Sequence, residues 1–391
     1  MTLIESAGPS SPARSAGAAG ADDASGGIIL DWFIPLTGDS RTDLSQGSAM
    51  TYAGQSGSRA RRAPDIGYLS QIARAVEHLG YHAVLIPTGG RSEESWTVTS
   101  ALTQHTRDLD YLVAFRPGMV SPTLQAEVAS TFQRVSGNRL RVNVVVGGDD
   151  AEQRKYGDRI DKDARYRRAA EYLSIVRRLW TGEQVDHHGE FYDIEGARIP
   201  RLDTVPEIYL GGSSDAAVEV AAEHADVYLT WGEPPAQAGA KVALVRERAA
   251  AAGRTLRYGV RLHVIARPTS EEAWRIADEL VAGLDPDVVA AARASFLASG
   301  SVGQRRQAEL VTGGLRRDDL EIVPGLWAGI GLVRGGAGTA LVGSFEEVAA
   351  LIRDYRAHGF TEFVLSGYPH LEEAYWFAEG VAPLLELAPR G

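Results

Sequence analysis

The stretch YLSQIARAVEHLGYHAVLIPTGG, residues 68–90, decides the fold class. Large apolar side chains recur at helical spacing through residues 68–79, and Gly80 follows at a position where helices commonly end. A short apolar run at residues 83–86 comes next and stops at Pro87. A run that is apolar on both faces is typical of a strand in a parallel sheet covered by helices. The stretch therefore predicts one helix–strand unit of an α/β protein.

The same unit repeats along the chain. We predict strands at residues 28–34, 83–86, 109–115, 140–146, 207–210, 227–230, 257–266 and 362–366, most of them separated by helices. Such alternation produces a parallel sheet with helices outside it, either as a closed barrel or as an open doubly wound sheet. The number of repeats favours an α/β fold of the (β/α)₈ TIM-barrel type with insertion regions. In such a barrel, function belongs at the carboxyl ends of the strands.

Two long segments interrupt the repeat. Residues 37–63 are rich in Gly, Ser and Arg, and residues 296–343 end in a glycine-dense run. Structureless segments longer than ~15 residues are uncommon in compact domains and are usually functional or disordered. We therefore expect an insertion loop at 37–63 and a lid region at 296–343, both above the barrel mouth. Residues 1–26, mostly small or polar, predict a disordered tail, and residues 27–391 a single barrel domain.

Composition limits the partners. The 391 residues carry a net charge of −11, and the basic side chains are scattered, which argues against nucleic acid as the main partner. The absence of cysteine excludes disulfides and thiol catalysis and fits a cytoplasmic protein. No apolar run approaches the ~20 residues needed to cross a membrane, and the start of the chain lacks the apolar core of a signal peptide. We predict no metal site, because His187 and His188 have no third ligand at metal spacing.

Arg334 is the most informative single side chain. It is followed by Gly335, Gly336, Ala337 and Gly338 in an almost uncharged segment. Glycine lets the backbone approach a ligand closely, and the guanidinium offers five donors suited to sulfonate, phosphate or carboxylate oxygens. The pattern indicates a mobile lid that carries an anion clamp. The alternative is a glycine-rich turn with an exposed arginine.

Other positions also suggest an anion site. Gly212, Ser213 and Ser214 join a strand to a helix, where free N–H groups and two hydroxyls suit a phosphate. An ordinary helix cap explains the same residues equally well. Lys162 and Tyr166 lie near the start of another helix and could meet a phosphate too. Alternatively, Tyr166 packs on the surface of its own helix.

Polar residues also interrupt two of the strands. A buried Asn143 must find hydrogen-bond partners, either on the polar edge of a flavin or sugar or on neighbouring backbone. Arg261 and His263 alternate on one strand and therefore point to the same side. The neighbouring apolar run favours the barrel interior for both, against an exterior polar face.

Six segments resemble the alkanesulfonate monooxygenases, a branch of the bacterial luciferase-like flavin enzymes. They are residues 85–89, 211–215, 229–235, 261–265, 326–343 and 365–375, the last three being specific to the sulfonate branch. The resemblance covers about residues 28–388. It implies a luciferase-like barrel that uses reduced FMN (FMNH₂) as a co-substrate. It also implies a separate NAD(P)H-dependent FMN reductase as partner and a homodimer or homotetramer.

The resemblance also implies roles for individual residues. It places Thr88 and Asn143 near the isoalloxazine ring, and Lys162, Tyr166, Gly212, Ser213 and Ser214 at the FMN phosphate. The substrate side would comprise Trp231, Arg261, His263, Arg334 and Tyr368. Three positions depart from the common pattern, with Thr37 where the family often has His, Ser92 for Cys and Lys162 for His. Thr37 cannot replace an imidazole as an acid or base.

The leading hypothesis is an FMNH₂- and O₂-dependent monooxygenase that converts an organosulfonate to an aldehyde and sulfite. Arg261 and Arg334 would hold the sulfonate, with Arg261 and Tyr368 as hydrogen-bond or proton donors and His263 tuning them. The rivals are a related monooxygenase acting on a sulfone or another non-sulfonate substrate, and a non-catalytic flavin-binding barrel. A deazaflavin-dependent hydride transferase is a further alternative.

Overall fold

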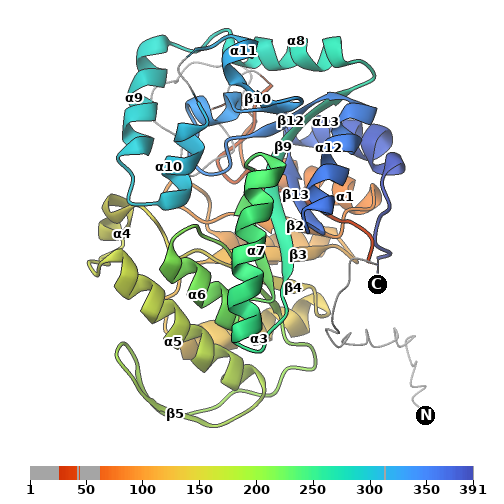
Figure 1. The fold of residues 1–391 in the computed structure, drawn as a ribbon. Coiled ribbons are helices and arrows are strands. Elements are labelled where there is room, and N and C mark those ends of the chain that lie inside the picture. The colour runs from red at the N-terminus through yellow and green to blue at the C-terminus, as the bar shows by residue number, and fades with distance from the viewer. Residues whose placement is uncertain (1–25, 42–43, 45–61, 312–313, 391) are drawn as a thin grey trace, which may run out of the picture.

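The computed structural model describes residues 26–41, 44, 62–311 and 314–390. Parallel strands form a closed barrel in the order β1-β2-β3-β4-β7-β8-β9-β13, and β13 pairs again with β1. Their bounds are β1 Ile29–Phe33, β2 Ala83–Ile86, β3 Asp110–Phe115, β4 Leu140–Val144, β7 Glu207–Leu210, β8 Val227–Trp231, β9 Arg257–Arg267 and β13 Glu362–Ser366. The predicted (β/α)₈ TIM barrel is confirmed, and each predicted strand is present within a few residues (Figure 1).

Helices surround this barrel. They are α1 Ile66–His78, α2 Ser95–Leu102, α3 Pro122–Ser136, α4 Asp150–Lys155, α5 Lys162–Trp180, α6 Asp215–His224, α7 Pro235–Ala251, α8 Ser270–Val281, α12 Phe345–Ala357 and α13 His370–Trp376. Side-chain caps start many of them; for example, Asp161 accepts from the Ala164 N–H at the start of α5. The prediction missed α7, because its Ala-, Lys- and Arg-rich sequence has only a weak apolar face. Apart from the barrel, β5 Val185–His188 and β6 Asp193–Ala197 pair as an antiparallel hairpin.

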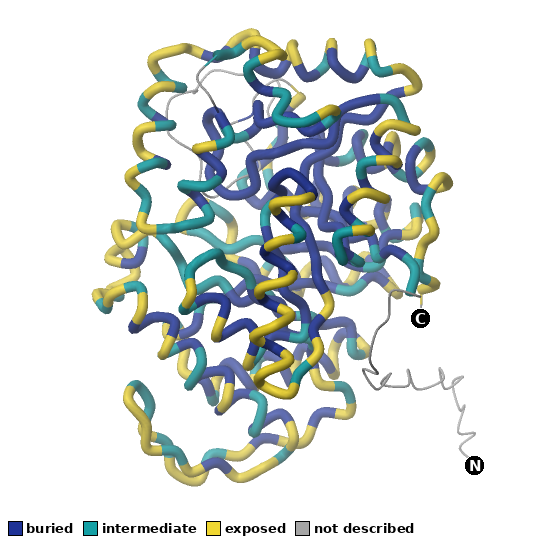
Figure 2. The backbone as a smooth tube through the Cα atoms, viewed as in Figure 1, coloured by how far each residue is buried: buried dark blue, intermediate teal, exposed yellow. Residues whose placement is uncertain are grey.

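Two buried regions of the barrel differ in chemistry: the layer between the strands and the helices, and the space inside the strands. The largest apolar cluster lies between strands and helices, and the backbone there is buried (dark blue in Figure 2). Inside the barrel, the amino-terminal strand ends instead carry charge: Arg141 lies 2.9 Å from Asp110 and 3.8 Å from Asp31, and Arg257 lies 2.8 Å from Glu362. Burial raises the pKa of Asp31 to about 7. This charged cluster fills the amino-terminal end of the barrel interior, so a ligand site can form only at the carboxyl ends of the strands.

The region 296–343 is not a structureless loop, so that part of the prediction is wrong. Several short elements follow α9 Pro286–Leu297 in this region: α10 Val302–Glu309, α11 Arg317–Leu320, β10 Glu321–Val323, β11 Leu326–Trp327 and β12 Ala340–Ser344. Strands of two or three residues are too short to show a period in the sequence. β12 pairs in parallel with the second half of β9, from His263↔Ala340 to Arg267↔Ser344.

Other predicted segments fall largely outside the described residues. These are nearly all of the tail 1–26 and most of the insertion loop 37–63. The ordered beginning of that loop contains Asp39, which pairs through its backbone with Arg62. Among the residues that the structure does describe, no helix combines the length and apolarity required to span a bilayer.

Candidate active site

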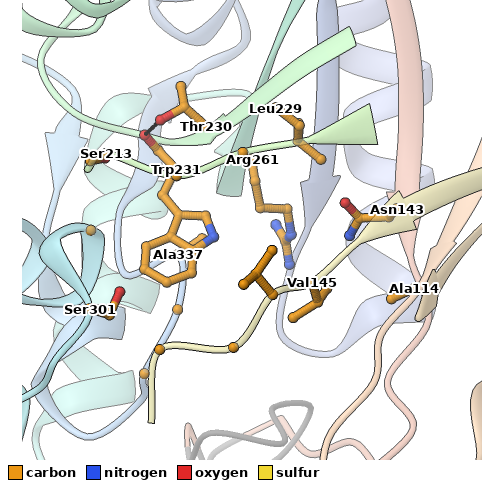
Figure 3. A pocket seen from close by; sticks show the side chains of 18 of the residues that line it. Ala114, Asn143, Val145, Ser213, Leu229, Thr230, Trp231, Arg261, Ser301 and Ala337 are labelled. Carbon is orange, nitrogen blue, oxygen red and sulfur yellow. Dashed lines mark hydrogen bonds between the residues drawn. The ribbon is translucent and has the colours of Figure 1, made fainter. Parts of the chain in front are cut away.

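A cavity of about 280 Å³ lies at the carboxyl ends of the strands. All but two of the residues predicted for the site line it: Thr88, Asn143, Lys162, Tyr166, Gly212, Ser213, Ser214, Trp231, Arg261 and Arg334. Figure 3 shows Trp231, Arg261 and Asn143 directed toward a common space, with Val145 and Ala337 beside it. His263 and Tyr368 are the two exceptions, and both lie behind the cavity wall.

One end of the cavity is built from the turn between β7 and α6. A Cβ atom at Gly211 would lie 1.9 Å from the Leu229 carbonyl oxygen, so only glycine fits there. Gly212 adopts a φ of +146°, which also favours glycine. Ser214 caps α6 by accepting from the Ala217 N–H at 3.4 Å. The cap is therefore present, and the helix start still faces the cavity.

Hydroxyl and ammonium groups surround this turn. The hydroxyl of Tyr166 bonds Ser214, and burial raises the pKa of Tyr166, so that it stays a neutral donor at pH 7. Lys162 donates from Nζ to the Gly300 carbonyl oxygen at 3.2 Å. Free N–H groups, hydroxyls and a cation at one point form a site suited to a phosphate.

A second helix start, not predicted from the sequence, faces the same end. Ser301 caps α10 by accepting from the Gln304 N–H at 3.2 Å, and Ser301 and Gly303 line the cavity. A Cβ at Gly303 would lie 3.4 Å from the Trp231 ring and 3.8 Å from the Ser213 hydroxyl. The first turn of α10 is therefore packed against both residues. The only sequence signal was Ser301 in front of a glycine-containing polar segment.

The opposite end contains two arginines. Arg261 and Arg334 are buried, and their guanidinium carbons lie 4.6 and 5.6 Å from the centre of the Phe33 ring. Arg261 donates to the Ser366 hydroxyl at 2.7 Å and to the Val364 carbonyl at 3.4 Å. Among the described residues it forms no ion pair with a carboxylate. Burial and the positive charge of Arg334 lower the pKa of Arg261, an electrostatic penalty that a bound anion would relieve.

His263 and Tyr368 support this pair from behind. The two rings stack with centroids 5.7 Å apart, and Arg334 contacts His263 Nε2. His263 Nδ1 lies 2.7 Å from the Ser366 hydroxyl, and Nε2 lies 3.2 Å from the Ala337 carbonyl oxygen. Burial and the two arginines hold the pKa of His263 well below its usual value, so the imidazole is neutral at pH 7.

A buried ion pair escaped the sequence prediction. Lys241 Nζ lies 3.0 Å from Glu233 Oε1 and 3.0 Å from the Thr230 hydroxyl, and all three residues line the cavity. Arg306 of α10 adds a contact of 2.8 Å to Glu233 Oε2. Lys241 lies on α7, where a lysine among alanines gives no signal of burial. The network fixes the end of β8 next to Trp231.

A second buried pair lies under the arginines. Asp39 Oδ1 is 3.0 Å from His370 Nδ1, and Asp39 Oδ2 accepts from the His370 N–H at 2.7 Å and from the Tyr68 hydroxyl. Burial opposes ionisation of Asp39, yet these contacts lower its pKa. Burial lowers the pKa of His370. The pair is thus a carboxylate that orients a neutral imidazole.

The comparison with protein families agrees with this arrangement. The family described as luciferase-like monooxygenase matches residues 42–362. The chain belongs to the luciferase-like monooxygenase family. That match covers most of the barrel, from the 37–63 segment to β13.

Several solved structures share the fold of this luciferase-like chain. A riboflavin lyase (RcaE) with modified FMN and riboflavin matches at 20% identity over 93% of each chain, with a TM-score of 0.72. EDTA monooxygenase (EmoA) from Chelativorans sp. BNC1 matches at 20% identity over 93% of this chain and 95% of that one, with a TM-score of 0.73. An F420-dependent secondary alcohol dehydrogenase matches at 16% identity over 92% and 99%, with a TM-score of 0.62.

Proposed function

We propose that the protein is an FMNH₂-dependent monooxygenase that cleaves the C–S bond of an organosulfonate. One observation carries the proposal: Arg261 and Arg334 lie buried side by side at one end of the cavity, while a phosphate-type site occupies the other end. A flavin phosphate and a substrate anion would account for both ends. An uncharged substrate would leave the penalty on Arg261 unrelieved.

The residues at the first end fit an FMN phosphate. The backbone at Gly211 and Gly212 approaches the cavity without a side chain, next to the α6 N-terminus and the Ser213 hydroxyl. Lys162 adds a positive charge and Tyr166 a neutral donor. Thr88 and Asn143 offer hydrogen-bonding groups farther along the wall, where the isoalloxazine would lie. When bound, reduced FMN supplies the two electrons that activate O₂.

The proposed reaction balances. One molecule each of sulfonate, O₂ and FMNH₂ gives an aldehyde, sulfite, FMN, water and one proton. The carbon–sulfur bond breaks, and one oxygen atom of O₂ ends in the aldehyde and the other in water. FMNH₂ and the substrate carbon are oxidised, and O₂ is reduced.

The protein residues bind, orient and shield. Arg261 and Arg334 would hold the sulfonate oxygens, where each charge-assisted hydrogen bond is worth about 1.5–3 kcal/mol. Phe33, Trp231 and the first turn of α10 would exclude water from the reacting atoms. Tyr368 and the neutral His263 would hold the Arg334 guanidinium in place. A separate NAD(P)H-dependent reductase would supply FMNH₂. We further propose a cytoplasmic homodimer or homotetramer.

The decisive experiment is a sulfite-release screen over a panel of sulfonates with reductase-supplied FMNH₂. Sulfite that depends on enzyme, O₂ and sulfonate supports the proposal. Oxygen uptake that is stimulated by a sulfone or amine, with no sulfite from any sulfonate, would favour a monooxygenase of another substrate class. Absence of any substrate-dependent turnover with FMNH₂ would leave a flavin-binding barrel or an F420-dependent enzyme.

A further inference from the structure

Helix α10 contacts the phosphate end of the cavity and the end of β8. Its first turn, at Ser301 and Gly303, lines the phosphate end and touches Trp231. One turn later, Arg306 binds Glu233 at 2.8 Å, which joins the helix to the end of β8. Figure 1 shows α10 beside α9, above the barrel.

Two glutamines on α10 hold the loop that carries Arg334. Gln304 Oε1 accepts from the Gly336 N–H at 2.8 Å, and Gln307 Oε1 accepts from the Gly338 N–H at 3.0 Å. Gln307 also donates from Nε2 to the Gly232 carbonyl oxygen at 2.8 Å. Residues three apart share a helix face, so both amides reach the same loop. Both side chains are buried.

The sequence of the loop alone determines its shape only weakly. Three of its four residues from 335 to 338 are glycine, whose backbone loses the most conformational freedom when it is ordered. The close approach of Gly338 to Gly331 closes the base of the loop, through the Gly331 N–H and the Gly338 carbonyl at 2.9 Å. In this loop, the two glutamine oxygens accept from the amides of Gly336 and Gly338.

We infer that Gln304 and Gln307 are positioning residues that set the place of the Arg334 guanidinium. Each fixes one peptide group on the C-terminal side of Arg334 relative to α10. Other contacts join α10 to β8 and to the phosphate end. The glutamines therefore fix the position of the substrate anion site relative to the cofactor site. Neither glutamine is required to touch a ligand. The catalytic consequence rests on the proposed function, in which Arg334 holds the sulfonate.

The test compares Gln304→Leu with Gln304→Glu in the full-length enzyme. Leucine fills a similar volume but accepts no hydrogen bond, whereas glutamate keeps an acceptor oxygen for Gly336. The matched control is Gln133→Leu on α3, a buried glutamine that, like Gln307, serves two backbone groups, the Leu140 N–H at 3.0 Å and the Thr204 carbonyl at 2.8 Å. Gln133 lies away from the cavity lining.

The first readout is hydrogen exchange of the amides in residues 332–340, measured by mass spectrometry. We expect about tenfold faster exchange there in Gln304→Leu, and wild-type exchange in Gln133→Leu. The second readout separates the two ligands. KM for the sulfonate turned over by the wild type should rise about tenfold in Gln304→Leu, while the Kd for FMNH₂ changes less than about twofold. In Gln304→Glu, KM for the same sulfonate should lie close to the wild-type value.

The outcomes are distinguishable from those of the proposed function. Unchanged exchange at 332–340 in both Gln304→Leu and Gln307→Leu would overturn the inference, whatever the enzyme oxidises. Equal KM effects in Gln304→Leu and Gln133→Leu would show general destabilisation and would also overturn it. Absence of sulfite from the wild type would refute the sulfonate assignment, and the exchange experiment would still decide the positioning role.

Discussion

Replacing Asp31 by asparagine should change how the stability of the barrel depends on pH. Asp31 is fully buried on β1, and its nearest cation is Arg141 at 3.8 Å, beyond hydrogen-bond distance. Burial is the main cause that raises the pKa of this carboxyl group from 3.8 to about 7, and nearby Glu362 and Asp110 add to it. Asparagine has the same shape but no charge to bury.

The sign of the effect follows from proton uptake. Between pH 3.8 and pH 7, Asp31 holds its proton in the folded protein and releases it in the unfolded chain. The folded state therefore loses stability relative to the unfolded state as the pH rises through this window, and the whole penalty is present above pH 7. A pKa difference of about 3 units, at about 1.4 kcal/mol each, gives about 4 kcal/mol.

Urea unfolding of wild type and Asp31→Asn at pH 4, 6 and 8 measures this penalty. The free energy of unfolding of the variant, relative to wild type, should increase from near zero at pH 4 by up to about 4 kcal/mol at pH 8. The exposed Glu127→Gln on α3 is the control and should track wild type across this range. A difference between variant and wild type that does not vary with pH would refute the reasoning.

Three further predictions concern the site. Arg261→Ala should abolish sulfite production while FMNH₂ affinity changes little; retention of more than about a tenth of the rate, or ~1.4 kcal/mol of barrier, would argue against a catalytic role. Ser213→Ala combined with Ser214→Ala should weaken FMNH₂ binding by about 1–3 kcal/mol in a fluorescence titration, and unchanged affinity would place the phosphate elsewhere. Protease cleavage within 296–343 should be fast without ligands and slowed by FMNH₂ with a sulfonate together; equal rates would rule out gating by this region.

The barrel could be predicted because its strands are apolar on both faces. Each such run announces a buried strand, and the order of the strands then fixes which turns lie together at the barrel mouth. The resemblance to the alkanesulfonate monooxygenases assigned Asn143, Ser213, Trp231 and Arg261 to one site, and the strand order explains why these residues from different strands or turns line one cavity. The barrel topology brings together residues that lie far apart in the sequence.

Other parts of the site left little trace in the sequence. The Glu233–Lys241 pair depends on a helix with too weak a periodicity to detect, and a buried lysine looks like any surface lysine. The region 296–343 contains short helices and strands of two to five residues, and β12 is stabilised by pairing with β9 rather than by a pattern of its own. Gln304 and Gln307 resemble solvated helix residues until the loop they hold is placed.

The role of His263 also needed the structure. Alternation with Arg261 placed both side chains inside the barrel, but it could not show that Arg334 would cover the imidazole. The aromatic ring of Tyr368 behind it comes from β13 and its turn, more than a hundred positions along the chain. Contacts of that range are set by packing, so sequence alone could name these residues and not their order around the cavity.

Strand β9 has a consequence for engineering. Its first half completes the barrel between β8 and β13, and its second half pairs with β12 outside the barrel. In a chimaera that exchanges the segment above the mouth, the new segment must therefore contain a strand that pairs with residues 263–267. Otherwise the backbone groups of that half-strand lose their hydrogen bonds. Transplanting 268–344 as one block respects this boundary and leaves Arg261 untouched. Exchange of this block could then alter the substrate range while the strands of the barrel stay unchanged.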